Sequence, residues 1–511
     1  MGLFDLFKSA KPEPERKRTP VRFNFSSAVG DSIRSILTAA GVTRLESTWT
    51  TTATTADSYI SRHWTTIVAR SREQAENGDH ARKYVVMQQD NIIGPNGLVL
   101  NSQAKDPDGK PDKLARKVIE EAWEIQGEVG NFDVTGRMSR VDCERLALRT
   151  AVVDGEAIAI LRYGDEYGPF GFAVQMVDPM LLDPGHFERL PSGNVVKHGI
   201  EFNADGKAVA YHFLHQDKRI DDYSAGGYSN RGKHDRIEAK YVVHAFKVEM
   251  VGQKRGLPWM RTALGRLRML SAFEDAALVN ARVGAAKMGF FRDSETSAED
   301  EPDDLPMDAE AGVFENIGSK EFVSYNPQFP DPFMGQFSQS LLRSIASGLS
   351  VSYNTLASDL TAVNFSSIRQ GALDDREHAK ADQVWFEKNW TRKIFNAWLE
   401  AALLSNKITV AGKPLRLERK SKYMAANFQG RRWGWIDPQA EVQANILAIQ
   451  NNLKSKSEAI RDGGNDIETV FDEIQAEKAE EAARKIAPPP PPGSPMSGNA
   501  VGAKETKNPQ A

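Results

Sequence analysis

The chain has 511 residues, of which 26% are charged and 40% hydrophobic, and its formal net charge at pH 7 is −4. This length predicts several domains, because a single hydrophobic core stops growing at about 250–300 residues. The near balance of acids and bases argues against a surface that grips nucleic acid tightly, and the single cysteine, Cys143, excludes an intramolecular disulfide.

The first half of the chain mixes predicted helices with predicted strands. Residues 1–45, basic and proline-rich near their start, are expected to form a flexible arm. Apolar spacing predicts a strand–turn–strand hairpin over 92–100 and helices over 55–89, 113–126 and 140–153. The apolar period then changes to two, which predicts a β-rich subdomain with strands over 157–161, 172–177, 195–200, 208–213 and 241–246.

Two predicted helices flank an acidic insert in the middle of the chain. The first opens at Pro258, a residue that suits the first turn of a helix, and the second spans 337–349. The insert is broken by prolines and carries strand candidates over 312–316 and 321–325. We expect the two helices to pack together through five apolar side chains, namely Leu267, Leu270, Phe273, Leu341 and Ile345.

A very long helix dominates the second half. Residues 353–365 show no steady period, and a helical pattern then holds from Ser366 to Asn406, about 40 residues or roughly 60 Å at 1.5 Å per residue. A helix of that length needs an extended partner or an assembly to lie across. A hairpin over 407–417, three helices between 437 and 486, and a proline-rich tail over 487–511 are predicted to follow.

No motif asks for phosphate binding or a membrane span. Residues 227–233 have the spacing of a phosphate loop, but His234 stands where a hydroxyl ligand for Mg²⁺ is required, and the segment lies between strands. No apolar run approaches the roughly 18 residues of a membrane helix. The sequence therefore predicts neither a nucleotide site nor a transmembrane segment.

No residue pattern asks for a metal, a cofactor or a catalytic group. The nine histidines are scattered, and the close pair His212 and His215 would point to opposite faces of a strand. Asp106, Asp108 and Asp112 resemble the start of a calcium loop but lack its later glutamate, so a solvated turn is the better interpretation.

Four blocks of the sequence, in order, resemble lambda-type portal proteins of tailed bacteriophages. The most specific block is carried by Gly348, Tyr353, Asp359, Asn364, Phe365, Ser366, Ser367 and Arg369. The other three are Arg70-Ser71-Arg72 with Gly94 and Gly97, Asp178-Pro179 with 243–246 leading into Arg255-Gly256-Leu257-Pro258, and Trp433-Gly434-Trp435-Ile436-Asp437-Pro438. The resemblance covers roughly residues 70–486.

The resemblance implies an α+β, multidomain portal fold. Its parts would be a mixed α/β wing (46–257), two paired stem helices (258–290 and 333–352) and a small α/β clip between them (291–332). A tunnel loop (353–365), a long wing helix with a hairpin (366–430) and a helical crown (431–486) would complete the fold.

The resemblance also implies a function and partners. About 12 copies would form a ring at one capsid vertex of the virion, assembled in the host cytoplasm. Double-stranded DNA would enter and leave through its channel, which would dock the terminase large subunit and a head–tail connector and contact the major capsid protein and scaffold. The alternatives are a DNA-processing enzyme of the nuclease or terminase kind, which would need clustered metal-binding carboxylates, or a head adaptor without a channel.

Two groups of residues would face DNA in such a ring. The tunnel-loop residues Ser358, Asp359, Leu360, Thr361, Ala362, Val363 and Asn364 hold one acid and no base, so they could touch DNA without clamping it. The simpler interpretation, in which Asp359 only caps a turn, is equally open. The acidic clip residues Glu299, Asp300, Glu301, Asp303 and Asp304 would repel phosphates, unless they are an ordinary solvated surface.

Overall fold

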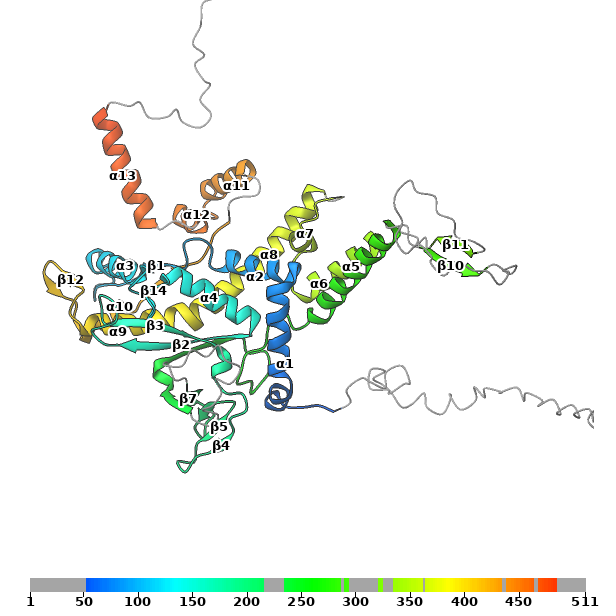
Figure 1. Ribbon diagram of the computed structural model, residues 1–511. Coiled ribbons are helices and arrows are strands. Elements are labelled where there is room, and N and C mark those ends of the chain that lie inside the picture. The colour runs from blue at the N-terminus through cyan, green and yellow to red at the C-terminus, as the bar shows by residue number, and fades with distance from the viewer. Residues whose placement is uncertain are drawn as a thin grey trace, which may run out of the picture. The chain divides into compact units, whose positions relative to one another are not determined.

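The computed structural model describes residues 52–215, 234–285, 289–293, 320–324, 334–361, 364–433, 438–463 and 467–484. The chain divides into two compact units, 1–55 and 56–511, and the second holds the helices and sheets described below (Figure 1). None of the helices in these ranges has the length and apolarity to cross a membrane. The predicted arm and tail lie outside the described residues.

The predicted helix over 55–89 is two helices, α1 (Ala56–Asn77) and α2 (Asp79–Ile92). They meet at Gly78, where a Cβ atom would lie 2.8 Å from the backbone oxygen of Gln74. The backbone of Gly78 is extended (φ −99°), so it is the missing side chain that permits this close approach. The helical pattern of apolar residues runs through this break and does not reveal it.

The predicted hairpin over 92–100 is wrong. Ile92 ends α2, and a turn with positive φ angles at Gly94 (72°) and Gly97 (71°) leads into β1 (Val99–Ser102). The strand pairs antiparallel with β14 (Ala426–Gln429), near the other end of the chain. Local periodicity predicts that a strand forms here, but not its distant partner.

A three-stranded antiparallel sheet lies at the centre of the main core. Its strand order is β3 (Phe172–Val177), β2 (Glu156–Tyr163) and β9 (Val242–Phe246). Helix α4 (Arg140–Val153) contacts β2, and α9 (Arg392–Leu404) contacts β2 and β3 (Figure 1). Trp123 of α3 (Lys113–Gly127) packs edge-on against Phe395 of α9, with ring centroids 5.4 Å apart.

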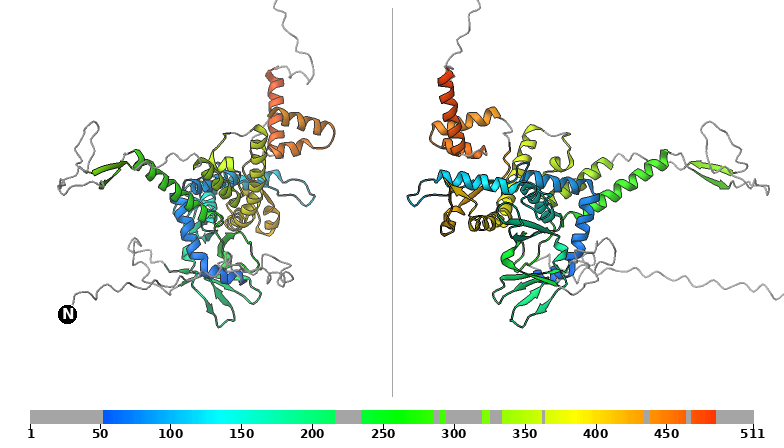
Figure 2. Two further views of the ribbon diagram at one scale, coloured as in Figure 1. Left: turned by 90° about the vertical axis from the view of Figure 1, so that its right-hand side faces the viewer. Right: turned by 60° about the vertical axis from the view of Figure 1, so that its left-hand side comes forward.

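A second sheet has five antiparallel strands in chain order, and Figure 2 shows it as a sheet of its own. The strand predicted over 208–213 is confirmed, whereas the single strand predicted over 195–200 is two strands, because the backbone divides at the positive φ angles of His198 and Gly199. Two short strands were not predicted. The five are β4 (Glu188–Arg189), β5 (Val195–Lys197), β6 (Ile200–Phe202), β7 (Ala208–Leu214) and β8 (His234–Glu238).

One buried arginine fastens this second sheet to the first. Arg255 donates from Nε to Glu156 of β2 at 2.7 Å and from its terminal nitrogens to the carbonyls of Pro179, Leu182 and His198 at 2.9–3.2 Å. Its guanidinium carbon lies 4.2 Å from the ring centroid of Trp64 in α1. Burial alone would raise the pKa of Glu156, but Arg255 and His244 lower it to about 2.

Two helices run side by side toward a small two-stranded sheet (Figure 1). The first, α5 (Leu264–Ala285), begins six residues later than predicted, because Pro258 to Ala263 form turns rather than helix. The second, α6 (Met334–Gly348), lies as expected. The sheet joins β10 (Gly289–Asp293), which was not predicted, to β11 (Lys320–Ser324), which confirms the strand expected over 321–325. The candidate over 312–316 lies outside the described residues.

The long helix is confirmed in extent but is not uniform. It comprises α8 (Phe365–Phe386), a π-helical turn over Glu387–Thr391, and α9. Thr391 donates its hydroxyl to the buried Glu144 of α4 at 3.3 Å, and Arg392 binds Glu387 of the π turn. The irregular segment before the helix also contains one unexpected helical turn, α7 (Tyr353–Ala357).

The C-terminal region follows the predicted order. Strands β12 (Thr409–Val410) and β13 (Lys413–Pro414) form the hairpin, and the short α10 (Lys420–Tyr423) precedes β14. The three predicted helices are α11 (Pro438–Gln450), α12 (Lys456–Asp462) and α13 (Ile467–Arg484). The Ser455 hydroxyl accepts the Glu458 N–H at 3.0 Å, as a capping serine does.

Candidate functional site at the base of the α6–α8 loop

The loop between α6 and α8 begins with a tight reversal of the backbone. Ser350 has a φ of 55°, and the Val351 N–H donates to the Ala346 carbonyl at 3.1 Å across the end of α6. The Gly348 carbonyl accepts the Thr262 hydroxyl at 2.5 Å. A Cβ at Gly348 would lie 3.5 Å from the Thr262 side chain, which is an ordinary van der Waals distance. The local packing therefore does not require glycine at this position.

An aspartate of the long helix fixes the loop's first turn. Asp375 accepts the Ser352 N–H at 2.8 Å, the Ser352 hydroxyl at 2.7 Å and the Thr355 hydroxyl at 3.1 Å. Because its carboxylate binds the N-cap residue Ser352 and Thr355 of α7, it holds that short helix against α8. Leu356 of α7 is fully buried in the main core and completes the attachment.

The tip of the loop is exposed and its acid is occupied locally. Asp359 accepts the Thr361 N–H at 2.9 Å, the Thr361 hydroxyl at 2.5 Å and the Tyr353 hydroxyl at 2.7 Å. Hydrogen bonds from Thr361 and Tyr353 lower the pKa of Asp359 to about 2. Asp359 thus caps the turn of its own loop, and Leu360 is left 66% exposed at the tip.

The remaining predicted loop residues divide into two sets. Ser358 has a φ of 54° and its hydroxyl contacts the Lys83 ammonium of α2, and Thr361 and Asn364 are exposed. Ala362 and Val363 lie outside the described residues, as do all five predicted acidic clip residues and the phosphate-loop-like segment over 227–233.

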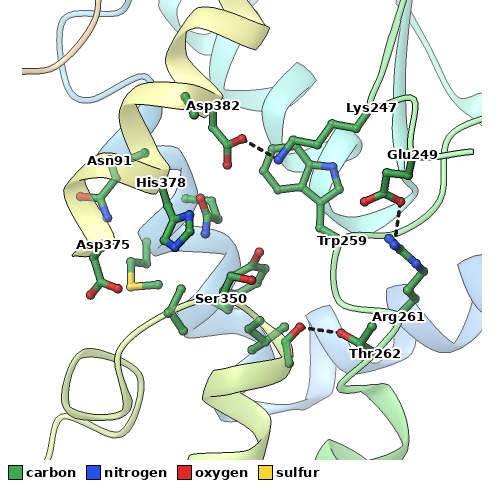
Figure 3. Close-up of a pocket in the computed structure, with 18 residues that line it drawn as sticks. Asn91, Lys247, Glu249, Trp259, Arg261, Thr262, Ser350, Asp375, His378 and Asp382 are labelled. Atoms are coloured by element: carbon green, nitrogen blue, oxygen red, sulfur yellow. Dashed lines mark hydrogen bonds and ion pairs between the residues drawn. The ribbon is translucent and has the colours of Figure 1, made fainter. Parts of the chain in front are cut away.

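A cavity of about 330 Å³ lies beneath the loop, between α2, α8 and the segment before α5 (Figure 3). The Lys247 ammonium bridges two of its walls, 3.4 Å from the Trp259 ring centroid and 2.6 Å from an Asp382 carboxylate oxygen of α8. Glu249 and Arg261 form a second pair across 2.6 Å. The Lys247–Asp382 contact ties α8 to the segment before α5, and the Glu249–Arg261 pair lies within that segment (Figure 3).

The five predicted stem residues lie where α5 meets α6. Leu267, Leu270 and Ile345 are at most 3% exposed and share one core cluster, against which Leu341 packs. Phe273 contacts Phe337 of α6, with ring centroids 5.0 Å apart. Because this cluster also contains the aromatic residues of α9, the buried face of α5 belongs to the fold of one chain.

The structure assembles histidines that the sequence leaves scattered. The rings of His186 and His234 stack at 4.0 Å, and His212 meets His186 edge-on at 5.1 Å. The Nε2 atom of each ring lies beside one carboxylate. His186 is paired with Glu188, His234 with Asp183 and His212 with Glu201. Across the described residues no group of three His, Cys, Asp or Glu side chains has metal-binding geometry.

The proposed solvated turn at Asp106 is a binding point for a lysine. The Lys422 ammonium of α10 lies 2.7 Å from an Asp106 oxygen and 2.5 Å from an Asp112 oxygen, so a side-chain cation occupies the position between these two carboxylates. Asp108 pairs with Lys110 at the surface.

Sequence reasoning missed Asp375 and Lys247, which hold the loop and the cavity wall. Each acts on a partner more than 20 residues away in the chain, and no spacing rule links such positions. One signal was available for Asp375. It follows Asp374, and an acid facing inward from a long helix has to find donors there.

We expect Asp375→Asn to loosen the loop without unfolding the chain. An amide accepts with only one oxygen, so the paired contacts to Ser352 and Thr355 would be lost at a cost of about 1–2 kcal/mol. Amide hydrogen exchange over 352–361 should speed up while exchange in α9 stays slow. Asp374→Asn, whose acid binds the exposed Gln370, is the matched control. Unchanged exchange in the Asp375 variant would refute the anchoring role.

Comparison with known proteins identifies the family. Residues 43–383 match the model of the phage portal protein, lambda family. A probable portal protein of Halomonas phage phiHAP-1 is 29% identical over 90% of this chain and 89% of that protein. The portal protein of Escherichia phage N15 is 21% identical over 86% and 89%, and portal protein B of Escherichia phage lambda 27% identical over 30% and 29%.

Solved structures of gene transfer agent particles are also similar. A chain from the neck of an empty particle, computed with C6 symmetry, has a TM-score of 0.41 at 12% identity, over 78% of this chain and 93% of that chain. A chain from the neck of a native particle, computed with C12 symmetry, has a TM-score of 0.40 at 10% identity, over 76% and 92%. The family model spans two thirds of the sequence and includes the α6–α8 loop, so this chain belongs to the lambda family of phage portal proteins, which are structural rather than enzymatic components of the capsid.

Proposed function

We propose that about 12 copies of this chain form a closed ring at one capsid vertex, through whose channel double-stranded DNA is packaged and ejected. The observation that carries the proposal is the family match over residues 43–383. The terminase large subunit and a head–tail connector would dock on the ring, with the major capsid protein and scaffold around it. Assembly would take place in the host cytoplasm before the ring becomes part of the virion.

Each part of the chain has a place in this proposal. The side-by-side helices α5 and α6 would be the stem, and β10 with β11 would belong to the clip. Residues 46–257 with α8 and α9 would form the wing, and α11, α12 and α13 the crown. The loop over 353–365 would line the channel at its narrowest point. A loop that carries one internally bonded acid and an exposed Leu360 would contact DNA weakly, as sliding requires.

The test of the ring is its mass and shape. Light scattering of the purified chain should show a species many times the 56.6 kDa mass of one chain, and negative-stain images should show rings with a central hole. A monomer that cleaves DNA would instead favour the DNA-processing enzyme, and a small oligomer without a hole would favour the adaptor.

The channel position of the loop has its own expected result. Deleting Leu360 to Val363 removes the exposed Leu360 and the Thr361 donor of Asp359, but it leaves the attachment of Ser352 to Asp375 in place. Ring size should therefore stay unchanged, while DNA packaging or the retention of packaged DNA should change. Light scattering and a packaging assay with phage proheads measure the two effects separately. If the deletion abolishes folding, or an image of the ring places the loop on its outer rim, the loop does not line the channel.

A further inference from the structure

Helix α5 is apolar on two opposite sides, and only one of them is covered. Leu264, Leu267 and Leu270 on one side are 8%, 3% and 1% exposed. The other side carries residues at alternating intervals of four and three, which we call the outer stripe: Gly265, Met269, Ala272, Ala276 and Val279. Met269 is 68% exposed and Val279 is 56% exposed, and the three small residues are exposed as well.

The spacing of the outer stripe is that of a surface that packs against another helix. Intervals of four and three residues keep side chains within one narrow band, since a helix turns about 100° per residue. The small side chains would let a second helix approach closely: a Cβ atom at Gly265 would meet nothing within 4 Å. If this side of α5 faced only water, it would normally carry polar residues.

The N-terminal part of the outer stripe borders a groove between α1 and α5. The groove has a volume of about 800 Å³, and its lining includes Ile67 and Gln74 of α1 and Leu264, Met269 and Ala272 of α5. The groove therefore continues the apolar surface of the outer stripe from α5 onto α1.

The charges around the groove do not suit DNA as the missing partner. Two of the three arginines that line the groove are paired with acids, Arg268 with Glu73 at 3.1 Å and Arg261 with Glu249 at 2.6 Å, and the third is Arg70. The outer stripe itself holds no charged residue, and Asp275 stands beside it. A surface for a polyanion would present unpaired bases over its whole length, whereas an uncharged stripe with both signs at its edges suits another protein helix.

We propose that the outer stripe and this groove are the contact surface for a second copy of this chain, one helix of which lies along the stripe. The proposal rests on the ring, in which every subunit must present faces to its neighbours. It divides the apolar surface of α5 between two tasks. The leucine face builds the subunit, and the outer stripe joins subunits.

Chemical labelling tests the assignment without disrupting the surface. Val279→Cys and Leu278→Cys place thiols at adjacent positions of equal exposure, 56% each, but only the first lies on the outer stripe. The natural cysteine, Cys143, is fully buried and burial raises its pKa, so it should stay silent toward a maleimide. On assembly, we expect the labelling rate to fall by about tenfold or more at position 279 and much less at 278.

A charge on the stripe provides the second measurement. Val279→Glu should yield folded monomers by circular dichroism and light scattering, whereas Leu278→Glu should still form the wild-type assembly. Intact assemblies from Val279→Glu, or equal protection of both thiols, would refute the proposal that the outer stripe contacts a second copy. Neither result would contradict the proposed ring. A wild-type chain that stays monomeric would instead overturn the ring. If Val279→Glu does not fold, the thiol measurement decides alone.

Discussion

Arg255→Met should lower the free energy of unfolding by about 3–5 kcal/mol, because it leaves the carboxylate of Glu156 buried without its main counter-charge. Both side chains of the pair are 0% exposed, and the guanidinium also satisfies three backbone carbonyls. Those carbonyls would lose their donor in the variant. Chemical denaturation of the wild-type and variant chains measures the difference.

The matched control is Arg268→Met, which removes the same charge from an exposed pair with Glu73, 74% and 52% exposed. An exposed pair is worth about 0–1 kcal/mol, so this variant should be nearly neutral. The double variant with Glu156→Gln should recover part of the loss at Arg255, since the unpaired charge is gone. A cost at Arg255 no larger than that of the control would contradict the role assigned to it.

The same pair sets a pH dependence whose sign can be worked out. The pKa of Glu156 falls from 4.5 to about 2 in the folded chain. A depressed carboxyl pKa stabilises the fold above 4.5, and this contribution is lost as the pH falls through about 2. In Arg255→Met, burial would raise the pKa of Glu156 above 4.5, so part of the variant's cost should disappear below that pH.

Gly155→Ala should cost at least about 4 kcal/mol and sharply reduce the yield of soluble chain. The φ angle at Gly155 is 95°, and a Cβ there would lie 2.3–2.6 Å from three backbone atoms of Leu257. A backbone that close cannot rotate aside as a side chain would. The result would separate the end of α4 from the Arg255 segment, which meet at this point.

Gly193→Ala is the control that isolates the clash. Its φ angle of 86° is similar, but a Cβ there would meet nothing within 4 Å, so only the backbone strain of about 1–2 kcal/mol should appear. Thermal unfolding of both variants gives the comparison. Equal losses at the two glycines would show that the close approach to Leu257 contributes nothing.

Elements whose information is local could be predicted, and those set by distant contacts could not. The long helix and the strands β2, β3, β7 and β9 follow from apolar periodicity over a few turns or residues. The break between α1 and α2 at Gly78 was not predicted, because the helical spacing of apolar residues continues through it. The start of α5 was placed six residues early, because Pro258 suits both the first turn of a helix and the turn in which the Arg261 N–H donates to the Pro258 carbonyl at 3.2 Å. The Trp259 N–H donates to the distant Val152 carbonyl at 3.0 Å.

The position of the α6–α8 loop could be predicted from the sequence, but the contacts that attach it to α8 could not. The block from Gly348 to Arg369 indicated where the loop lies, and the structure places it between α6 and α8. Its fixation by Asp375 depends on a hydrogen-bond set from another element. The stack of His186, just before β4, on His234, at the start of β8, likewise joins residues that are far apart in the sequence, and no periodicity could have linked them.

The pairing of β1 with β14 has a consequence for synthesis. Val99 pairs with Gln429, which is synthesised about 330 residues later. Ribosomes add about 5–20 residues per second. For some tens of seconds the nascent chain therefore holds Trp123 and its neighbours without Phe395, Trp398 and the closing strand. Subunits that meet during translation would meet unfinished, so chaperones and the order of release from the ribosome should govern how many copies become competent to join.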